Sequence, residues 1–246
     1  MTVVLKLGGS VITEKDRDET VDGESLDAAA AAIGDVIDEL DGLVVVHGGG
    51  SFGHPNAAAH GVSTTEGTHD TEGVLAIHGA MKTLNKFVLR RLREHDVPAV
   101  PVHPLSAASR DDTGELTLPT QQVRTLLDEG FVPVLHGDVI GHAGAGVTVV
   151  SGDELVVELA QGVDADRVGL CSAVPGVLDE DDAVIPRIDA YEEVANVLGA
   201  SDATDVTGGM AGKVQALLDL DVEASIFDLD SIGPFLADER VGTTID

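Results

Sequence analysis

Three of the five lysines in this chain of 246 residues stand beside glycine-rich turns. Lys6 precedes the turn GGS at 8–10, Lys15 closes the segment VITEK, and Lys213 ends the segment TGGMAGK at 207–213. Each could instead form a surface salt bridge, which contributes little to stability. Ammonium groups that converge on glycine turns suit phosphoryl transfer, because positioning and charge neutralisation supply most of the catalysis there. We therefore expect these lysines to be catalytic.

A second glycine turn lies in the segment LVVVHGGGSFGHP at 43–55. Its β-branched run predicts a buried strand, and the consecutive glycines predict a tight turn with uncovered amide groups. If a helix begins near His54 to His60, its positive end and these amides favour an anion such as phosphate. The same glycines satisfy the pattern GxGxxG, which is typical of dinucleotide sites, so that alternative stays open.

The segment TGGMAGKV does not match a P-loop, because Thr207 stands where a glycine is needed and Val214 follows the lysine. Two carboxylates are better placed for chemistry. Asp138 and Asp153 each follow a glycine at an expected strand end, where a carboxylate could hold magnesium or align lysines. Helix capping is the alternative, above all for Asp153.

Among the histidines, His47 and His54 flank the second glycine turn. His54 could donate a hydrogen bond to a phosphate, or it could be an exposed loop residue. No HExxH motif and no Cys/His spacing indicates zinc. The single cysteine, Cys171, lies in an apolar run, so we expect no disulfide and no cysteine-based metal site.

Alternating strands and helices must position these residues. Apolar runs and spacing predict strands at 3–7, 43–46, 99–102, 131–135, 147–150, 167–171, 224–227 and 241–245. Helical periodicity predicts helices at 25–40, 72–94, 120–129, 154–161, 191–198 and 210–220, and a hairpin or loop precedes Val147. This order, with no obvious linker, predicts a doubly wound, largely parallel α/β sheet and a single domain over 1–246.

The charge of the chain excludes two classes of partner. It carries 44 acidic residues against 14 Lys plus Arg, for a formal net charge of -30. Such a surface repels nucleic acid and anionic lipid. It favours adaptation to concentrated salt, where self-repulsion is screened. The first residues read as a strand rather than a signal peptide, and no apolar run is long enough for a membrane span, so we expect a soluble, cytoplasmic protein.

Four motifs, KLGGSVITEK at 6–15, VVVHGGGSFGHP at 44–55, SGDE at 151–154 and VTGGMAGK at 206–213, keep their order over nearly the whole chain. Together they resemble the amino acid kinase superfamily, and within it the archaeal isopentenyl phosphate kinases. The resemblance implies a three-layer αβα sandwich, usually a homodimer. It also implies transfer of the γ-phosphate of Mg-ATP to isopentenyl phosphate, with the acceptor site in the N-terminal part and the nucleotide site in the C-terminal part.

The resemblance also implies roles for individual residues. Lys6 and Lys213 would hold the ATP phosphates, Lys15 would stabilise the transition state, and Asp153 would align the lysines. The nucleotide side would be shaped by Gly8, Gly9, Ser10, Gly50 and Gly209. The acceptor phosphate would be bound by Gly49, His54 and Gly152. In one place the chain departs from the family. Relatives tend to read TDVDGV near adenosine, where this chain has SAVPGV at 172–177 and so lacks the acidic side chains expected there.

An isoprenoid tail would need an apolar pocket. The residues predicted to supply it are Val74, Ile77, Met81, Val139, Ile140, Val147 and Val149. The motifs leave three alternatives open. A related phosphate or phosphonate kinase, such as a fosfomycin kinase, shares much of the motif set. A dinucleotide-dependent oxidoreductase would rest on GxGxxG alone, and a non-catalytic nucleotide sensor could use the same fold.

Overall fold

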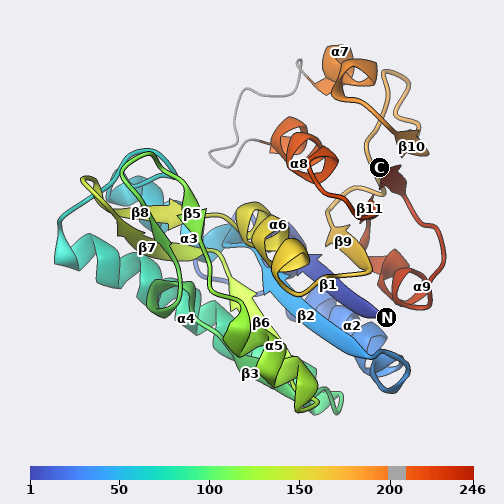
Figure 1. Cartoon of the computed structure of the whole chain (residues 1–246), viewed down its shortest axis with the longest axis horizontal. Helices are drawn as coiled ribbons and strands as arrows, with labels where there is room; N and C mark the ends of the chain where they lie inside the picture. The colour runs from blue at the N-terminus through green and yellow to red at the C-terminus, as the bar shows by residue number, and fades with distance from the viewer. Residues whose placement is uncertain (199–208) are drawn as a thin grey trace.

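The computed structural model describes residues 1–198 and 209–246, which form an α/β fold built on a large twisted sheet (Figure 1). Among the described residues this sheet has eight strands, in the order β10, β12, β11, β9, β1, β2, β6, β3. Every pairing in it is parallel except that of β11 with β12. The strands are β1 (Thr2–Leu7), β2 (Gly42–His47), β3 (Ala99–Pro101), β6 (Val132–His136), β9 (Arg167–Cys171), β10 (Arg187–Ile188), β11 (Ala224–Phe227) and β12 (Thr243–Ile245).

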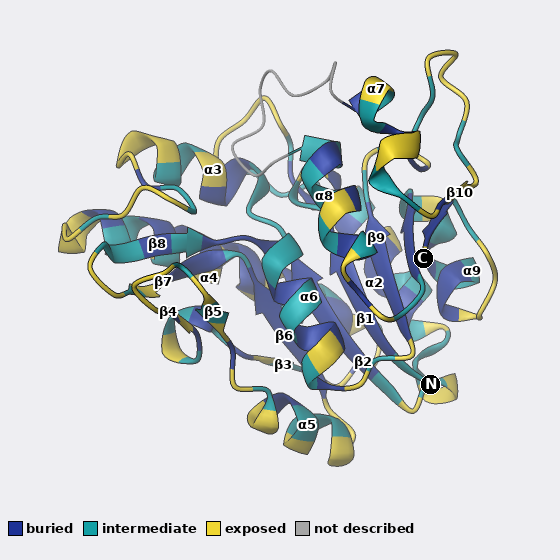
Figure 2. Cartoon of the chain, turned by 45° about the horizontal axis from the view of Figure 1, so that its top comes forward, coloured by how far each residue is buried: buried dark blue, intermediate teal, exposed yellow. Residues whose placement is uncertain are grey.

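Helices cover both faces of the large sheet, so the expected three-layer sandwich is confirmed (Figure 2). One face carries α5 (Gln121–Asp128), α6 (Gly152–Gly162) and α8 (Gly209–Leu218). The other carries α2 (Gly23–Gly34), α4 (Thr71–Glu94) and α9 (Ile232–Leu236). Successive strand residues point to opposite faces, so the central strands contribute to both cores.

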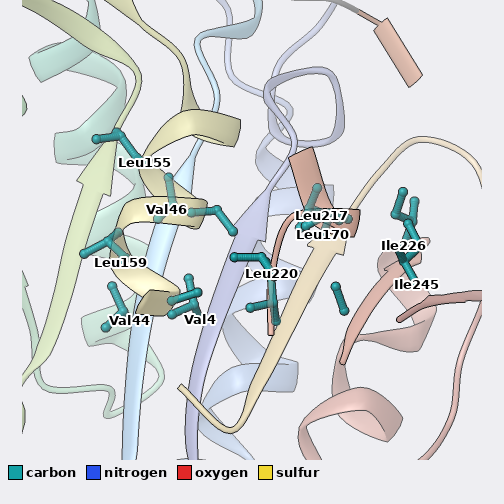
Figure 3. Packing of buried hydrophobic residues seen from close by; sticks show 14 of the residues in the cluster. Val4, Val44, Val46, Leu155, Leu159, Leu170, Leu217, Leu220, Ile226 and Ile245 are labelled. Carbon is teal, nitrogen blue, oxygen red and sulfur yellow. The ribbon is translucent and has the colours of Figure 1, made fainter. Parts of the chain in front are cut away.

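Strand β1 shows this alternation directly. Val4 packs with Leu155 and Leu159 of α6 (Figure 3). Val3 and Leu5 belong to the core beneath α2 and α4. The fully apolar strands that the sequence predicts therefore arise because both faces of the parallel sheet are buried.

A smaller sheet lies beside the N-terminal half of α4. It has the order β5 (Leu116–Thr117), β4 (Ser109–Arg110), β7 (Asp138–His142), β8 (Gly146–Val150). Strands β7 and β8 form the hairpin expected before Val147. They pack with α4 and α3 (Gly50–Ala59) around a third small core centred on Val62, Ile77 and Val139.

Several element boundaries differ from the expectations. The helix expected over 25–40 ends at Gly34, whose missing Cβ lets the chain approach the carbonyl oxygen of His95, and a short 3-10 turn at Ile37–Glu39 leads into β2. Helix α3 begins at Gly50 rather than near His54, so the glycines themselves form its first turn. The expected helix over 191–198 is a 3-10 turn followed by the short α7 (Ala195–Leu198).

Two short helices were not expected from the sequence. Helix α1 (Gly9–Ile12) follows β1 directly, and α9 packs its buried Ile232 and Phe235 although Pro234 interrupts the pattern. Within residues 1–198 and 209–246, no helix has the length and apolar character needed to cross a lipid bilayer.

Candidate active site

A cavity of about 750 Å³ opens where the carboxyl ends of β1, β2 and β9 meet the first turns of α1, α3, α6 and α8. Open α/β sheets bind ligands at this edge, because helix N-termini and loop amides converge there. The residues predicted for catalysis and for phosphate binding all line this one cavity: Lys6, Gly8, Gly9, Ser10, Lys15, Gly49, Gly50, His54, Gly152, Asp153, Gly209 and Lys213. Of the motif VTGGMAGK, residues 206–208 lie outside the described residues.

The two glycine turns pack against each other through their backbones. A Cβ at Gly9 would lie 2.2 Å from the amide nitrogen of Gly50, and one at Gly48 would lie 2.7 Å from that of Gly9. Gly50 also has a φ of +48°, which favours glycine. The glycines are therefore required for close approach as well as for uncovered amides.

Thr13 joins these two turns and was missed by sequence reasoning. Its hydroxyl donates to the carbonyl of Gly9 at 2.7 Å and accepts from the amide of Ser51 at 3.0 Å. A buried hydroxyl between two glycine turns holds them in register. Its position within VITEK, between one turn and Lys15, was the only available signal.

Lys6 and Asp153 form an ion pair at the floor of the cavity. The Nζ of Lys6 lies 2.5 Å from Oδ1 of Asp153, and Lys6 is only 5% exposed. The stem of Lys6 passes over Gly152, where a Cβ would lie 3.0 Å from Cε. Gly152 therefore makes room for the lysine that Asp153 holds.

The capping interpretation of Asp153 is wrong, because another residue caps the helix. Ser151 is the N-cap of α6, and it forms a reciprocal capping box with Glu154. Arg110 donates to the other side of Glu154 at 2.5 Å, which fastens the helix start to the small sheet. Asp153 is thus left to hold Lys6, and α6 is anchored without it.

The other two lysines approach the cavity from separate elements. Lys213 lies in the second turn of α8 and donates from Nζ to the carbonyl of Gly209 at 3.2 Å. Lys15 and His54 are exposed residues at the rim. A phosphate in the cavity would therefore meet positive charge from three directions.

The end of β9 completes the wall on the side of α8. Cys171, Ser172, Ala173 and Val174 line the cavity there, and the amide of Gly8 donates to the carbonyl of Cys171 at 2.9 Å. Burial raises the pKa of the Cys171 thiol to about 12, so it stays protonated and is no nucleophile. The SAVPGV segment thus begins at the cavity, with small uncharged side chains in place of acidic ones.

Asp138 lines the cavity but is bound to a histidine rather than to a lysine. It is buried at the start of β7, where its carboxylate accepts from Nδ1 of His78 at 2.9 Å and from the amide of Leu105 at 3.4 Å. Burial raises its pKa, and the bond from His78 opposes that rise. Over 1–198 and 209–246, no group of three or more acidic, histidine or cysteine side chains is arranged to hold a metal ion.

The apolar wall lies between α4 and the small sheet. Ile77, Met81 and Val149 line the cavity. The remaining predicted tail-pocket residues Val74, Val139 and Val147 pack in the small third core beside it. The prediction that Ile140 lines the pocket is wrong. Ile140 alternates with Val139 along β7, so its side chain points to the other face and packs in the core beneath α6.

Comparison with known proteins supports a kinase site. The model of the amino acid kinase family matches residues 1–225. The chain is 60% identical to the isopentenyl phosphate kinase of Haloferax volcanii, over 99% of this chain and 98% of that protein. It is 31% identical to the isopentenyl phosphate kinase of Methanocaldococcus jannaschii, over 100% of this chain and 99% of that protein. The acidic composition fits the Haloferax relative.

A solved structure agrees over the full length. It is titled "X-ray structures of isopentenyl phosphate kinase" and superposes with a TM-score of 0.85 at 29% identity, covering 100% of both chains. The family model and the two relatives span the motifs that surround the cavity. The chain belongs to the amino acid kinase family.

Proposed function

We propose that this kinase transfers the γ-phosphate of ATP to isopentenyl phosphate, producing isopentenyl diphosphate and ADP. The observation that carries the proposal is the cavity itself, which gathers every predicted phosphate-binding residue around the Lys6–Asp153 pair. The identity of the acceptor is inferred from the relatives in Haloferax volcanii and Methanocaldococcus jannaschii, both named isopentenyl phosphate kinase.

The two ligands would divide the cavity between them. We assign the nucleotide to the side of β9 and α8, where Gly209 and Lys213 stand, with Gly8, Gly9, Ser10 and Gly50 beneath it. The acceptor phosphate would lie on the side of α3 and α6, against Gly49, His54 and Gly152. The acceptor site would thus lie mainly in the N-terminal part of a single domain, and the nucleotide site would join N-terminal glycines to Gly209 and Lys213 of the C-terminal part.

The acceptor phosphate needs no general base. Its second pKa is near 6, so it is already a nucleophile at neutral pH. It needs cations instead, because two anionic phosphates must approach in line. Lys6, held by Asp153, would lie between them, while Lys15 and Lys213 would neutralise charge that develops on the transferred group. His54 would donate a hydrogen bond to the acceptor.

Magnesium fits this site only as a companion of the nucleotide. Asp153 and Asp138, two carboxylates that line the cavity, are already engaged by Lys6 and His78. Mg²⁺ is commonly held by substrate phosphates and water together with few carboxylates. We therefore propose that Mg²⁺ enters on the ATP phosphates and supplies further charge neutralisation there.

The isoprenoid tail would extend away from the lysines. Ile77, Met81 and Val149 provide an apolar surface on the acceptor side, next to Ala57 of α3. Burying a short prenyl chain against them would stabilise the complex by about 0.8 kcal/mol per methylene group. A polar acceptor of the same charge would lose this contribution.

A coupled assay of ADP release tests the proposal. The protein should turn over Mg-ATP and isopentenyl phosphate in strong KCl, and Lys213→Met should lower the rate at least about 100-fold. Lys86→Met is the matched control, because Lys86 is an exposed residue of α4. Equal rates for both variants, or no turnover by the unmodified protein, would overturn the proposal.

A competition between acceptors and measurements of ligand binding distinguish the other functions. Preference for fosfomycin over isopentenyl phosphate would indicate a phosphonate kinase. ATP binding without turnover of any acceptor would indicate a nucleotide sensor, and stabilisation by NAD but not ATP would revive an oxidoreductase. The family resemblance also leads us to propose a cytoplasmic homodimer, which light scattering and cell fractionation would test.

A further inference from the structure

Four histidines form a connected group behind the glycine turn. His47 ends β2 and His136 ends β6, and the two residues are direct neighbours in the sheet. Their rings stack with centroids 5.4 Å apart, and both side chains are fully buried. His103 contacts His136, and His78 of α4 lies edge-on to His103. The proposed function uses none of these rings.

The hydrogen bonds define which ring nitrogens carry protons. Nδ1 of His47 lies 3.1 Å from the carbonyl oxygen of Gly48, and Nδ1 of His136 lies 2.9 Å from that of Gly137. A carbonyl only accepts, so both Nδ1 atoms must donate. Burial lowers the pKa of both rings, so each is neutral and its Nε2 accepts. Nδ1 of His103, 2.9 Å from Nε2 of His136, supplies one such donor.

Asn85 of α4 supplies the donor for His47. Its carboxamide oxygen faces Nε2 of His47 at 3.2 Å, while its buried Nδ2 has no hydrogen-bond partner among the described residues. Two acceptors do not bond, and a half-turn of the carboxamide exchanges its two ends without moving other atoms. Nδ2 of Asn85 then donates to His47. The ring of His47 is therefore held at both nitrogens and cannot rotate.

This fixed ring determines the direction of one peptide group. Because a trans peptide is planar, the amide hydrogen of Gly49 points opposite to the carbonyl of Gly48 that His47 holds. Gly49 lines the cavity, and its amide has no acceptor among the residues that the structure describes. Three consecutive glycines would otherwise leave this peptide free to adopt several orientations.

We propose that His47 is a positioning residue, whose Nδ1–H holds the Gly48–Gly49 peptide so that the Gly49 amide is presented to the acceptor phosphate. His136 and Asn85 act through it by fixing the plane of its ring. The inference rests on the proposed function for the identity of the acceptor. The predicted direction of the Gly49 amide does not depend on the proposed function, because any bound phosphate would accept a hydrogen bond from that amide.

Two substitutions separate positioning from packing. The amide nitrogen of asparagine reaches the place of Nδ1, whereas that of glutamine reaches the place of Nε2. His47→Asn should therefore keep the KM for isopentenyl phosphate within a few-fold. His47→Gln should raise it about 10-fold or more, as expected when one hydrogen bond to a charged group is misdirected. The KM for ATP should stay unchanged in both variants. His95→Asn, at the C-terminal cap of α4, is the control and should leave both KM values unchanged.

A second measurement needs no turnover. In protein labelled with ¹⁵N-glycine, inorganic phosphate should shift the Gly49 amide resonance downfield in the unmodified protein and in His47→Asn, but much less in His47→Gln. Equal behaviour of the two variants in both experiments would overturn the inference and leave His47 a packing residue. A phosphate shift at Gly49 without turnover of isopentenyl phosphate would retain the inference and refute the proposed acceptor.

Discussion

Acidification should weaken the fold through His47. Its pKa is lowered from 6.5 to about 4, because the fully buried ring loses the hydration of its charged form. The unfolded chain therefore binds this proton at a higher pH than the folded chain does. The free energy of unfolding should be unaffected above the unfolded pKa and should fall as pH drops toward the folded one.

The size of this loss follows from the pKa difference. Each pKa unit corresponds to about 1.4 kcal/mol, so the full loss is about 3 kcal/mol. Between about pH 7 and about pH 5 it amounts to about 2 kcal/mol, because only the unfolded state is then largely protonated at this site. His136 responds in the same direction, since burial also lowers its pKa.

The variant His47→Asn isolates the contribution of one ring. Urea unfolding of both proteins in strong KCl, at about pH 7 and about pH 5, should show that acidification costs the unmodified protein about 2 kcal/mol more than the variant. The contribution of the many surface carboxylates is common to both proteins and cancels. That of His136 becomes smaller in the variant, because His47 helps to lower its pKa, and this adds to the difference in the same direction. A parallel loss of stability in the two proteins would refute the assignment of a neutral, buried His47.

Three further predictions follow from the site and from the charge. Gly50→Ala should destabilise the protein by at least about 2 kcal/mol, because the φ of Gly50 is positive and the new Cβ would lie 2.1 Å from the Thr13 hydroxyl. Gly79→Ala, on the open face of α4, should stabilise it by about 1 kcal/mol. Denaturant unfolding measures both changes, and equal effects would contradict the crowding at Gly50. Asp153→Asn should lower kcat about 100-fold in steady-state kinetics through misplacement of Lys6, and a change in KM alone would argue against that role. The melting temperature should rise with KCl, because salt screens repulsion within a chain of net charge -30, and a salt-independent midpoint would speak against halophilic adaptation.

The local sequence was sufficient for most of the elements and for the lysines that line the cavity. Apolar runs located the central strands within a residue or two, because a strand buried on both faces needs a continuous apolar segment. Lysine is scarce in so acidic a chain, so Lys6, Lys15 and Lys213 stood out beside their glycine turns. All three line the cavity, as predicted.

Other features of the site depend on which strands are neighbours. Thr13 and Ser51 meet only because β1 and β2 pair in register, and His47 meets His136 only because β6 is the next strand. Their separations along the chain carry no local signal for these contacts. The histidine group and the Thr13 bridge were therefore not predictable from patterns in the sequence.

The sequence by itself determined that this is an α/β protein with three lysines at glycine turns, because periodicity and residue scarcity are local properties. The tertiary structure decided which residue does what at each turn. In the structure Ser151 caps α6, so Asp153 is available to pair with Lys6. Ile140 packs in the core beneath α6 and not in the apolar wall. These outcomes depend on strand order and on the face to which each side chain points, and both are set by the packing of the whole sheet.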